Sequence, residues 1–230
     1  MKLVLFDIDG TLLRSGGAGR RSMERALHGI FGTAGDDQYH YDGKTDKQIV
    51  RELMHRAGRD PEHVEEKMQE LLDNYLAGLN DALKMEQHRV MLYPGIPEIL
   101  DALESQDNVI LGLLTGNIEA GARKKLVAAG LDPDRFRVNA FGSDHAHRPE
   151  LPAIAQRRAQ EMLGVNVQGD RVVVIGDTPA DIDCGRSIGA RAIGVATGRF
   201  SVEELAAHSP YAVFQDLSDT PTVLQTILDA

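Results

Sequence analysis

The chain has 230 residues, 42% of them hydrophobic, and 35 acidic residues against 25 Lys and Arg give a formal net charge of −10. This length suffices for one sizeable core and a modest second unit, whereas the charge argues against nucleic acid or an anionic membrane as a partner. The single cysteine, Cys184, cannot form an internal disulfide and is typical of a reducing compartment. No apolar run approaches the ~20 residues of a membrane span, and no signal peptide pattern is present, so we expect a cytoplasmic protein.

The first predicted element is a buried strand that leads directly into two carboxylates. The apolar run Leu3–Phe6 is followed by Asp7 and Asp9. A continuous apolar run is typical of the centre of a parallel sheet, and open α/β sheets bind ligands beyond the carboxyl ends of their strands. Alternatively, the two aspartates merely open a turn that Gly10 completes.

The next stretch is glycine-rich and then helical. The segment Gly16–Gly19 contains three glycines and predicts a hinge rather than a phosphate-binding loop, because neither GxxxxGK[ST] nor GxGxxG spacing follows. Beyond it, apolar residues recur at helical spacing on both sides of a predicted loop over 36–46. We therefore expect an all-helical cap domain over residues 15–89, inserted into a catalytic core made of residues 1–14 and 90–230.

The rest of the chain alternates between strand and helix patterns. Gly130 and Gly164 follow two of the helices at the usual capping position. Pro179 opens a third helix, with Asp177 or Thr178 as its N-terminal cap. This alternation predicts an α/β fold with a doubly wound parallel sheet, a Rossmann-like core. The predicted strands are 109–114, 138–141, 171–176, 190–196 and 211–214, and the predicted helices are 96–103, 118–129, 150–163, 179–188 and 220–228.

Three further groups of polar residues follow the strands of this core. Thr115-Gly116-Asn117 ends one strand, Asp177 and Asp181 follow a later strand, and Arg148 offers a cation between them. With the opening Asp7-Ile-Asp9-Gly-Thr, this ordered set resembles the motifs of the haloacid dehalogenase-like (HAD) phosphohydrolases. The resemblance spans nearly the whole chain, and four motifs in order are far more specific than any one of them.

The resemblance implies a role for each acidic residue. Asp7 would be the nucleophile that forms an aspartyl-phosphate, and Asp9 the acid that protonates the leaving oxygen and then activates water. Mg²⁺ would be held by Asp7, by the backbone carbonyl of Asp9 and by Asp177, with Asp181 orienting ligands or water. Four carboxylates at one sheet edge would repel one another, which also calls for a cation. Asp177 and Asp181 are in addition suited to capping a helix.

Donors for the phosphate oxygens are expected from two other places. Thr115 offers a hydroxyl, and the amides of Gly116 and Asn117 open a helix N-terminus, which attracts anions. Arg148-Pro stands where family members usually carry Lys-Pro. A guanidinium at this position can bridge two phosphate oxygens at once.

Other cationic or metal-ligand residues compete with this assignment. Arg157 and Arg158 are alternatives to Arg148, although arginines in the middle of a helix usually face solvent. His145 and His147 alternate on a polar loop without a cysteine partner, which is more typical of exposed residues than of a metal site.

The predicted cap loop is expected to set substrate specificity through Tyr41, Lys44 and Thr45. Sugar phosphomutases that are similar in this region carry a basic residue near the position of Asp46, so the aspartate favours hydrolysis. We expect a Mg²⁺-dependent phosphatase, similar to phosphoglycolate phosphatases, that acts on a small phosphorylated metabolite as a monomer or homodimer. The alternatives are a phosphomutase and a regulatory or binding protein without turnover. A dinucleotide-binding protein is disfavoured because no GxGxxG follows the first strand.

Overall fold

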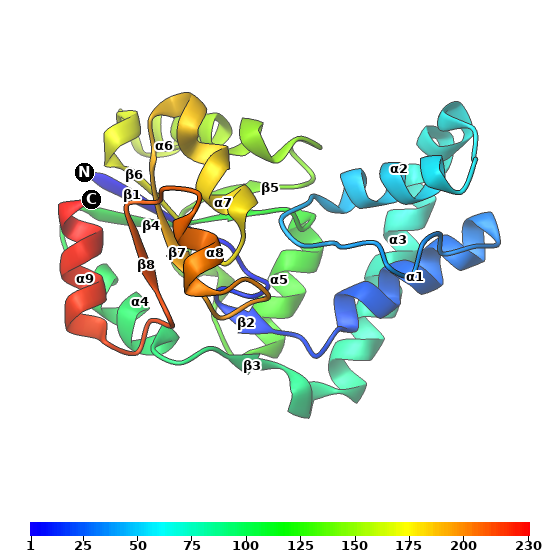
Figure 1. Cartoon of the computed structure of the whole chain (residues 1–230), viewed down its shortest axis with the longest axis horizontal. Helices are drawn as coiled ribbons and strands as arrows, with labels where there is room; N and C mark the ends of the chain where they lie inside the picture. The colour runs from blue at the N-terminus through cyan, green and yellow to red at the C-terminus, as the bar shows by residue number, and fades with distance from the viewer.

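A six-stranded parallel sheet forms the centre of the structure, a computed structural model that describes residues 1–230. The first strand of the chain lies in the middle, and later strands add outward on both sides (Figure 1). All neighbouring strands are parallel, so the predicted doubly wound α/β fold is confirmed. In sheet order the strands are β5 (Val138–Phe141), β4 (Val109–Thr115), β1 (Lys2–Phe6), β6 (Val172–Gly176), β7 (Arg191–Val195) and β8 (Ala212–Phe214).

The strand order reverses beside β1. On one edge of β1 Leu3 is paired with Ile110 of β4, and on the other edge it is paired with Val172 of β6. After β5 the chain returns across the sheet to β6. The crevice at such a reversal, beyond the carboxyl ends of the strands, is where α/β proteins bind their ligands.

Helices cover both faces of the sheet. The core helices are α4 (Ile96–Glu104), α5 (Glu119–Ala128), α6 (Leu151–Leu163), α7 (Pro179–Cys184), α8 (Val202–Ala206) and α9 (Thr220–Asp229). Val4 and Phe6 pack in an apolar cluster with residues of α4, α5 and α9, whereas Leu3 and Leu5 pack in another with residues of α6. Because successive strand residues point to opposite faces, one continuous apolar run supplies both clusters.

Three helices between the first two core strands form a separate apolar cluster. They are α1 (Ala18–Phe31), α2 (Asp46–Arg56) and α3 (Pro61–Met85). Leu27, Leu53 and Leu71 are buried where the helices meet, and the predicted loop between α1 and α2 is free of helix and strand. Figure 1 shows this helical unit to one side of the sheet, beside α5. No helix in the chain has both the length and the apolar character that a membrane span requires.

Several short elements differ from the prediction. β2 (Leu13–Arg14) and β3 (Met91–Leu92) pair antiparallel where the chain enters and leaves the helical unit, and neither was predicted. The predicted helix over 179–188 is wrong in its second half, because α7 ends at Cys184 and a tighter 3₁₀ turn follows. That turn brings the Ala190 amide within 2.9 Å of the Gly185 carbonyl.

The two ends of the chain lie side by side (Figure 1). Lys2 Nζ donates hydrogen bonds to the carbonyls of Ile227, Leu228 and Ala230 at 2.9, 2.7 and 2.6 Å. The last carbonyls of a helix have no partner within it, and a cation there also interacts favourably with the helix dipole. Lys2 therefore fastens the C-terminus of α9 to the start of β1.

Candidate active site

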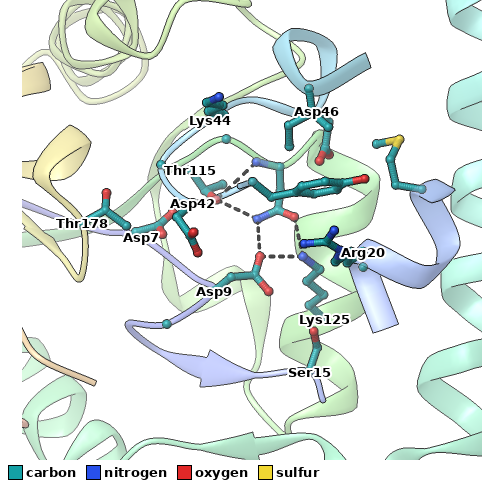
Figure 2. Close-up of a pocket in the computed structure, with 18 of the residues that line it drawn as sticks. Asp7, Asp9, Ser15, Arg20, Asp42, Lys44, Asp46, Thr115, Lys125 and Thr178 are labelled. Atoms are coloured by element: carbon teal, nitrogen blue, oxygen red, sulfur yellow. Dashed lines mark hydrogen bonds and ion pairs between the residues drawn. The ribbon is translucent and has the colours of Figure 1, made fainter. Parts of the chain in front are cut away.

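The carboxyl ends of the three central strands bring the predicted site residues together. Asp7 follows β1, Thr115 ends β4 and Asp177 follows β6. These ends line one side of a cavity of about 400 Å³, and the loop before α2 lines the opposite side. Figure 2 shows Asp7, Asp9 and Thr115 from the sheet edge together with Asp42 and Lys44 from that loop.

Three carboxylates crowd together at the sheet edge. Asp7, Asp177 and Asp181 are buried, and each offers an oxygen within 4.8 Å of the others. Burial raises the pKa of Asp7 to about 6, although the neighbouring Arg148 opposes this shift. Burial, followed by the charges of Asp181 and Asp7, raises the pKa of Asp177 well above its usual range. Carboxylates in this arrangement resist ionising together unless a cation joins them, so these residues fit a hard divalent cation such as Mg²⁺.

Hydrogen bonds distinguish Asp181 from the other members of this cluster. Asp181 Oδ2 accepts from the amide and the hydroxyl of Thr178 at 3.0 and 2.7 Å, and its Oδ1 accepts from Arg148. Thr178 in turn caps α7, as one of the two predicted alternatives, by accepting from the Asp181 amide. Asp177 uses only Oδ1, which accepts from the Thr11 hydroxyl at 3.0 Å. Asp177 therefore keeps an oxygen for a ligand, whereas both oxygens of Asp181 are occupied.

Arg148 is the cation that reaches Asp7. Its side chain is 4% exposed, and its guanidinium lies 3.2 Å from Asp7 Oδ1. It also contacts Asp181 and donates to the Leu114 carbonyl at 3.2 Å. Its Nε is buried without a hydrogen-bond partner in the chain, so Arg148 keeps one donor that an anionic ligand would satisfy.

The competing candidates lie away from the cavity. Arg158 pairs with Asp144 at 2.6 Å, and Arg157 is exposed on α6. His145 and His147 are exposed, and their ring centroids lie 6.2 Å apart in an edge-to-face arrangement. Neither histidine belongs to the acidic cluster described above.

Asp9 is turned toward α5 (Figure 2). Its Oδ2 accepts from Lys125 Nζ at 2.5 Å and from Asn117 Nδ2 at 2.8 Å, and Lys125 also donates to Asn117 Oδ1 at 2.6 Å. Lys125 was not predicted as a site residue. The signal was its position beside Ala122 and Leu126 on the buried face of a helix, where lysines are rare unless they are paired.

The predicted phosphate-binding loop follows β4. Thr115 Oγ1 accepts from the amide and from the side chain of Asn117 at 3.3 and 2.8 Å, and its own hydroxyl is bonded to no acceptor in the chain. The Asn117 amide is thus occupied within the loop rather than directed to a ligand. A Cβ on Gly116 would collide with the carbonyl of Lys44, so glycine permits a close approach between this loop and the helical unit.

Asp46 joins the helical unit to the same loop. Its amide donates to the Gly116 carbonyl at 2.8 Å, and its Oδ2 accepts from the Ile118 amide at 2.9 Å. Burial raises the pKa of Asp46 to about 6. The start of α2 therefore contacts the segment that leads into α5, and the loop before α2 covers the cavity in this structure.

The three residues predicted to contact substrate from this loop differ in their surroundings. Tyr41 and Lys44 line the cavity, and the Tyr41 hydroxyl is buried without a hydrogen-bond partner. Lys44 Nζ contacts the Tyr39 hydroxyl at 2.8 Å and Glu52 at 3.0 Å, and it points away from Asp9 (Figure 2). Thr45 is fully buried, donates to a core carbonyl at 2.6 Å and does not line the cavity.

The residues that line this cavity are spread along the chain from Asp7 to Thr178. A comparison with known protein families matches residues 1–189 to the haloacid dehalogenase-like hydrolases. The chain belongs to this family. The resemblance inferred from the ordered motifs is thereby confirmed.

This HAD-like hydrolase is similar to known phosphatases over most of its length. It is 30% identical to an N-acetylmuramic acid 6-phosphate phosphatase of Pseudomonas aeruginosa, across 100% of this chain and 95% of that protein. It is also 30% identical to a phosphoglycolate phosphatase of Rhodospirillum rubrum, across 94% of this chain and 88% of that protein.

Solved structures of similar shape support the fold of this HAD-like hydrolase. It superposes on a hydrolase from Pseudomonas syringae with a TM-score of 0.73 at 21% identity, over 99% of each chain. It also superposes on CbbY from Rhodobacter sphaeroides in complex with phosphate, with a TM-score of 0.72 at 18% identity, over 95% of this chain and 96% of that chain. At these identities the likeness establishes the fold alone.

Proposed function

We propose that this chain is a Mg²⁺-dependent phosphatase that hydrolyses a small phosphomonoester through an aspartyl-phosphate at Asp7. The observation that carries the proposal is the placement of the Asp7 carboxylate. It is buried at the switch point of the sheet, 3.2 Å from the Arg148 guanidinium and beside Asp177 and Asp181. A nucleophile, a cation for the phosphate and ligands for a metal thus meet at one point.

The enzyme class follows from the family and its relatives. The predicted class, a phosphoric monoester hydrolase, is confirmed by the HAD-like family match and by the phosphatases that are similar over most of the chain. The finer statements, namely the metal, the intermediate and the residue roles, are our proposal.

In the first proposed step, an oxygen of Asp7 forms a bond to phosphorus while the bond from phosphorus to the leaving oxygen breaks. The electron pair of that bond stays on the leaving oxygen, which takes a proton from Asp9 and departs as an alcohol. In the second step, Asp9 takes a proton from water, and the water oxygen forms a bond to phosphorus. The bond from phosphorus to Asp7 then breaks, which releases inorganic phosphate and restores the Asp7 carboxylate.

Other side chains at the site stabilise charge on the phosphoryl group. We infer that Arg148 Nε and the Thr115 hydroxyl donate to its oxygens, since neither donor has a partner in the chain. Mg²⁺ would be held by Asp7, Asp177 and the backbone carbonyl of Asp9, with Asp181 fixing Arg148. When bound, the ion would neutralise charge on the carboxylates and on the transferring phosphoryl group.

We propose that residues 15–89 act as a cap that restricts the substrate to small molecules. The cavity holds about 400 Å³ and is covered by the loop before α2, which leaves no room for a folded phosphoprotein. Two residues that line the cavity carry polar groups with few partners in the chain: the Tyr41 hydroxyl is buried without a hydrogen bond, and the Arg14 guanidinium donates to Met91 Sδ at 3.0 Å. A leaving group that carries hydroxyl, amide or carboxylate oxygens would satisfy both.

The arrangement favours hydrolysis over the predicted alternative of phosphoryl transfer between two positions of a sugar. A phosphomutase needs a second phosphate site, yet Asp46 presents a buried carboxylate to the cavity and the Lys44 ammonium is paired with Glu52. A non-catalytic role is disfavoured because Asp7 and Asp9 are both present at the cavity.

The test is phosphate release from a panel of small phosphate esters, with Mg²⁺ and after exhaustive chelation. We expect turnover that requires Mg²⁺ and that is abolished in Asp7→Asn, whose circular dichroism should remain that of the native protein. The Arg157→Ala variant, changed at an exposed site, serves as the matched control. Near-normal rates for Asp7→Asn, or full activity without metal, would contradict the proposal.

A further inference from the structure

Lys125 is a buried cation for which the family motifs assign no role. Its side chain is 5% exposed, although it lies on α5 between residues that pack against the sheet. A lysine at such a position ordinarily runs its stem along the apolar surface and extends its ammonium to water. Here the ammonium turns inward to the cavity, where it contacts Asp9 (Figure 2).

We propose that Lys125 is the positioning residue for Asp9, and this inference rests on the acid–base role proposed for Asp9 above. Lys125 and Asn117 both donate to Asp9 Oδ2, at 2.5 and 2.8 Å, and they are joined to each other at 2.6 Å. The three side chains form a closed ring of hydrogen bonds. The ring fixes the carboxylate and leaves Oδ1, which has no donor in the chain, as the atom that exchanges the proton.

Asn117 connects this ring to the phosphate-binding loop. Its Nδ2 donates to Thr115 Oγ1 at 2.8 Å as well as to Asp9. Asn117 therefore fixes the Asp9 carboxylate relative to the Thr115 hydroxyl, which is proposed to bind the phosphoryl oxygens. General acid catalysis depends on the placement of the acid relative to the phosphoryl group, because the proton must reach the leaving oxygen as the bond to phosphorus breaks.

The cap contacts Lys125 directly. A Cβ built on Gly19, in the first turn of α1, would lie 3.2 Å from Lys125 Nζ and 3.8 Å from the Tyr75 hydroxyl. Helix α1 therefore approaches the ammonium with bare backbone, and the Lys125 side chain is buried whereas the Asp9 side chain is 40% exposed. Burial of the Lys125 partner strengthens the attraction between the two charges.

The proposal predicts a loss that depends on the leaving group. Dinitrophenyl phosphate has a leaving oxygen that needs no proton, whereas glycerol phosphate has one that departs only when protonated. Since kcat/KM reports steps up to formation of the aspartyl-phosphate, Lys125→Met should lower it by about 10²-fold or more for glycerol phosphate. For dinitrophenyl phosphate the loss should be only a few-fold. Lys125→Arg, which keeps the cation, should recover part of the glycerol phosphate rate.

Two comparisons separate positioning from a structural role. Lys124→Met changes the neighbouring lysine, whose Nζ only approaches Asn80 at 3.4 Å, and should leave both rates unchanged. In an Asp9→Asn background, Lys125→Met should add no further leaving-group dependence. An equal loss for both esters, or full additivity of the two changes, overturns the proposal.

Two further outcomes, a Lys125→Met variant that does not fold and a native protein without activity, also decide on the proposal. If Lys125→Met does not fold, Lys125→Arg alone decides, because a displaced guanidinium should still produce a larger loss for glycerol phosphate, and an unchanged ratio of the two rates overturns the inference. If the native protein hydrolyses neither ester and no other phosphate ester, the proposed function fails first, and the inference on Lys125 fails with it.

Discussion

Arg148 lies between Asp7 and Asp181, and this position determines what its removal does. Arg148→Ala should lower kcat/KM by about 10²–10³-fold, the loss typical of one donor to a transition state. It should also reduce the free energy of unfolding by about 3–5 kcal/mol, because two buried carboxylates lose their cation. Steady-state kinetics and urea unfolding measure the two effects separately.

Matched arginines provide the controls for this prediction. Arg148→Lys keeps the charge but not the several donors of the guanidinium, so it should fold better than Arg148→Ala and still lose activity. The exposed Arg157 on α6 should tolerate replacement by alanine in both assays. If Arg157→Ala or Arg158→Ala reproduced the loss and Arg148→Ala did not, the phosphate-binding cation would be misassigned.

Asp46 should make stability depend on pH. A carboxyl whose pKa is about 6 in the folded protein, against 3.8 without burial, binds its proton more tightly when folded. Its stabilising contribution is therefore complete below about pH 4 and is lost as the pH rises through about 6. Asp46→Asn should remove this dependence, so the variant should gain about 1–3 kcal/mol relative to the native chain between pH 4 and 7.

The measurement for Asp46 is urea unfolding of both proteins across that pH range. The difference between them isolates Asp46 from Asp7 and Asp177, which also titrate. A difference that stays constant with pH would show that Asp46 is ionised at the same pH in the folded and unfolded states.

Sequence alone predicted the residues that stand immediately after strands. Asp7, Thr115 and Asp177 occupy the ends of apolar runs, and parallel topology brings such ends together whatever the rest of the fold does. Lys125 was missed because its partner, Asp9, is 116 residues away in the chain. Only the tertiary fold brings the loop after β1 close to α5, and no local spacing encodes that contact.

At the level of single elements, two glycines of α1 are a matched pair for testing the contact with α5. A Cβ on Gly29 would meet nothing within 4 Å, so Gly29→Ala should stabilise the chain by about 0.5–1 kcal/mol through helix propensity. Gly19→Ala should fall short of this gain and should lower kcat/KM, because its methyl group would displace Lys125 Nζ from its two short hydrogen bonds. Urea unfolding and kinetics of both variants measure this, and equal gains with unchanged kinetics would contradict it.

The elements that the sequence failed to predict are short or lack an apolar period. β2 and β3 have two residues each, which is too few for an alternating pattern. The five-residue α8 has a capping box between Ser201 and Glu204, a signal that was present but overlooked. By contrast, Gly130 and Gly164 both adopt positive φ after α5 and α6, as their capping positions predicted.

For the whole molecule, Mg²⁺ should act as a stabilising ligand as well as a cofactor. An ion that binds only the folded cluster of Asp7, Asp177 and the Asp9 carbonyl raises the free energy of unfolding by about 2.7 kcal/mol at 100 times its dissociation constant. For a chain of this size each kcal/mol raises Tm by about 2–4 °C. Thermal unfolding with Mg²⁺ and after chelation measures the shift. Asp177→Asn should abolish it, and an unchanged Tm in the native protein would exclude the site.

The central place of β1 sets the order in which the chain assembles on the ribosome. β1 emerges before its two neighbours in the sheet, which begin only at Val109 and Val172. The contacts within α1–α3 are local, so this helical unit can collapse once Met85 has emerged. Until β4 and β6 emerge, Leu3–Phe6 remains an unpaired apolar strand. The nascent chain is then most exposed to aggregation or chaperone capture. Lys2 can donate its hydrogen bonds to the end of α9 only after Ala230 has left the exit tunnel.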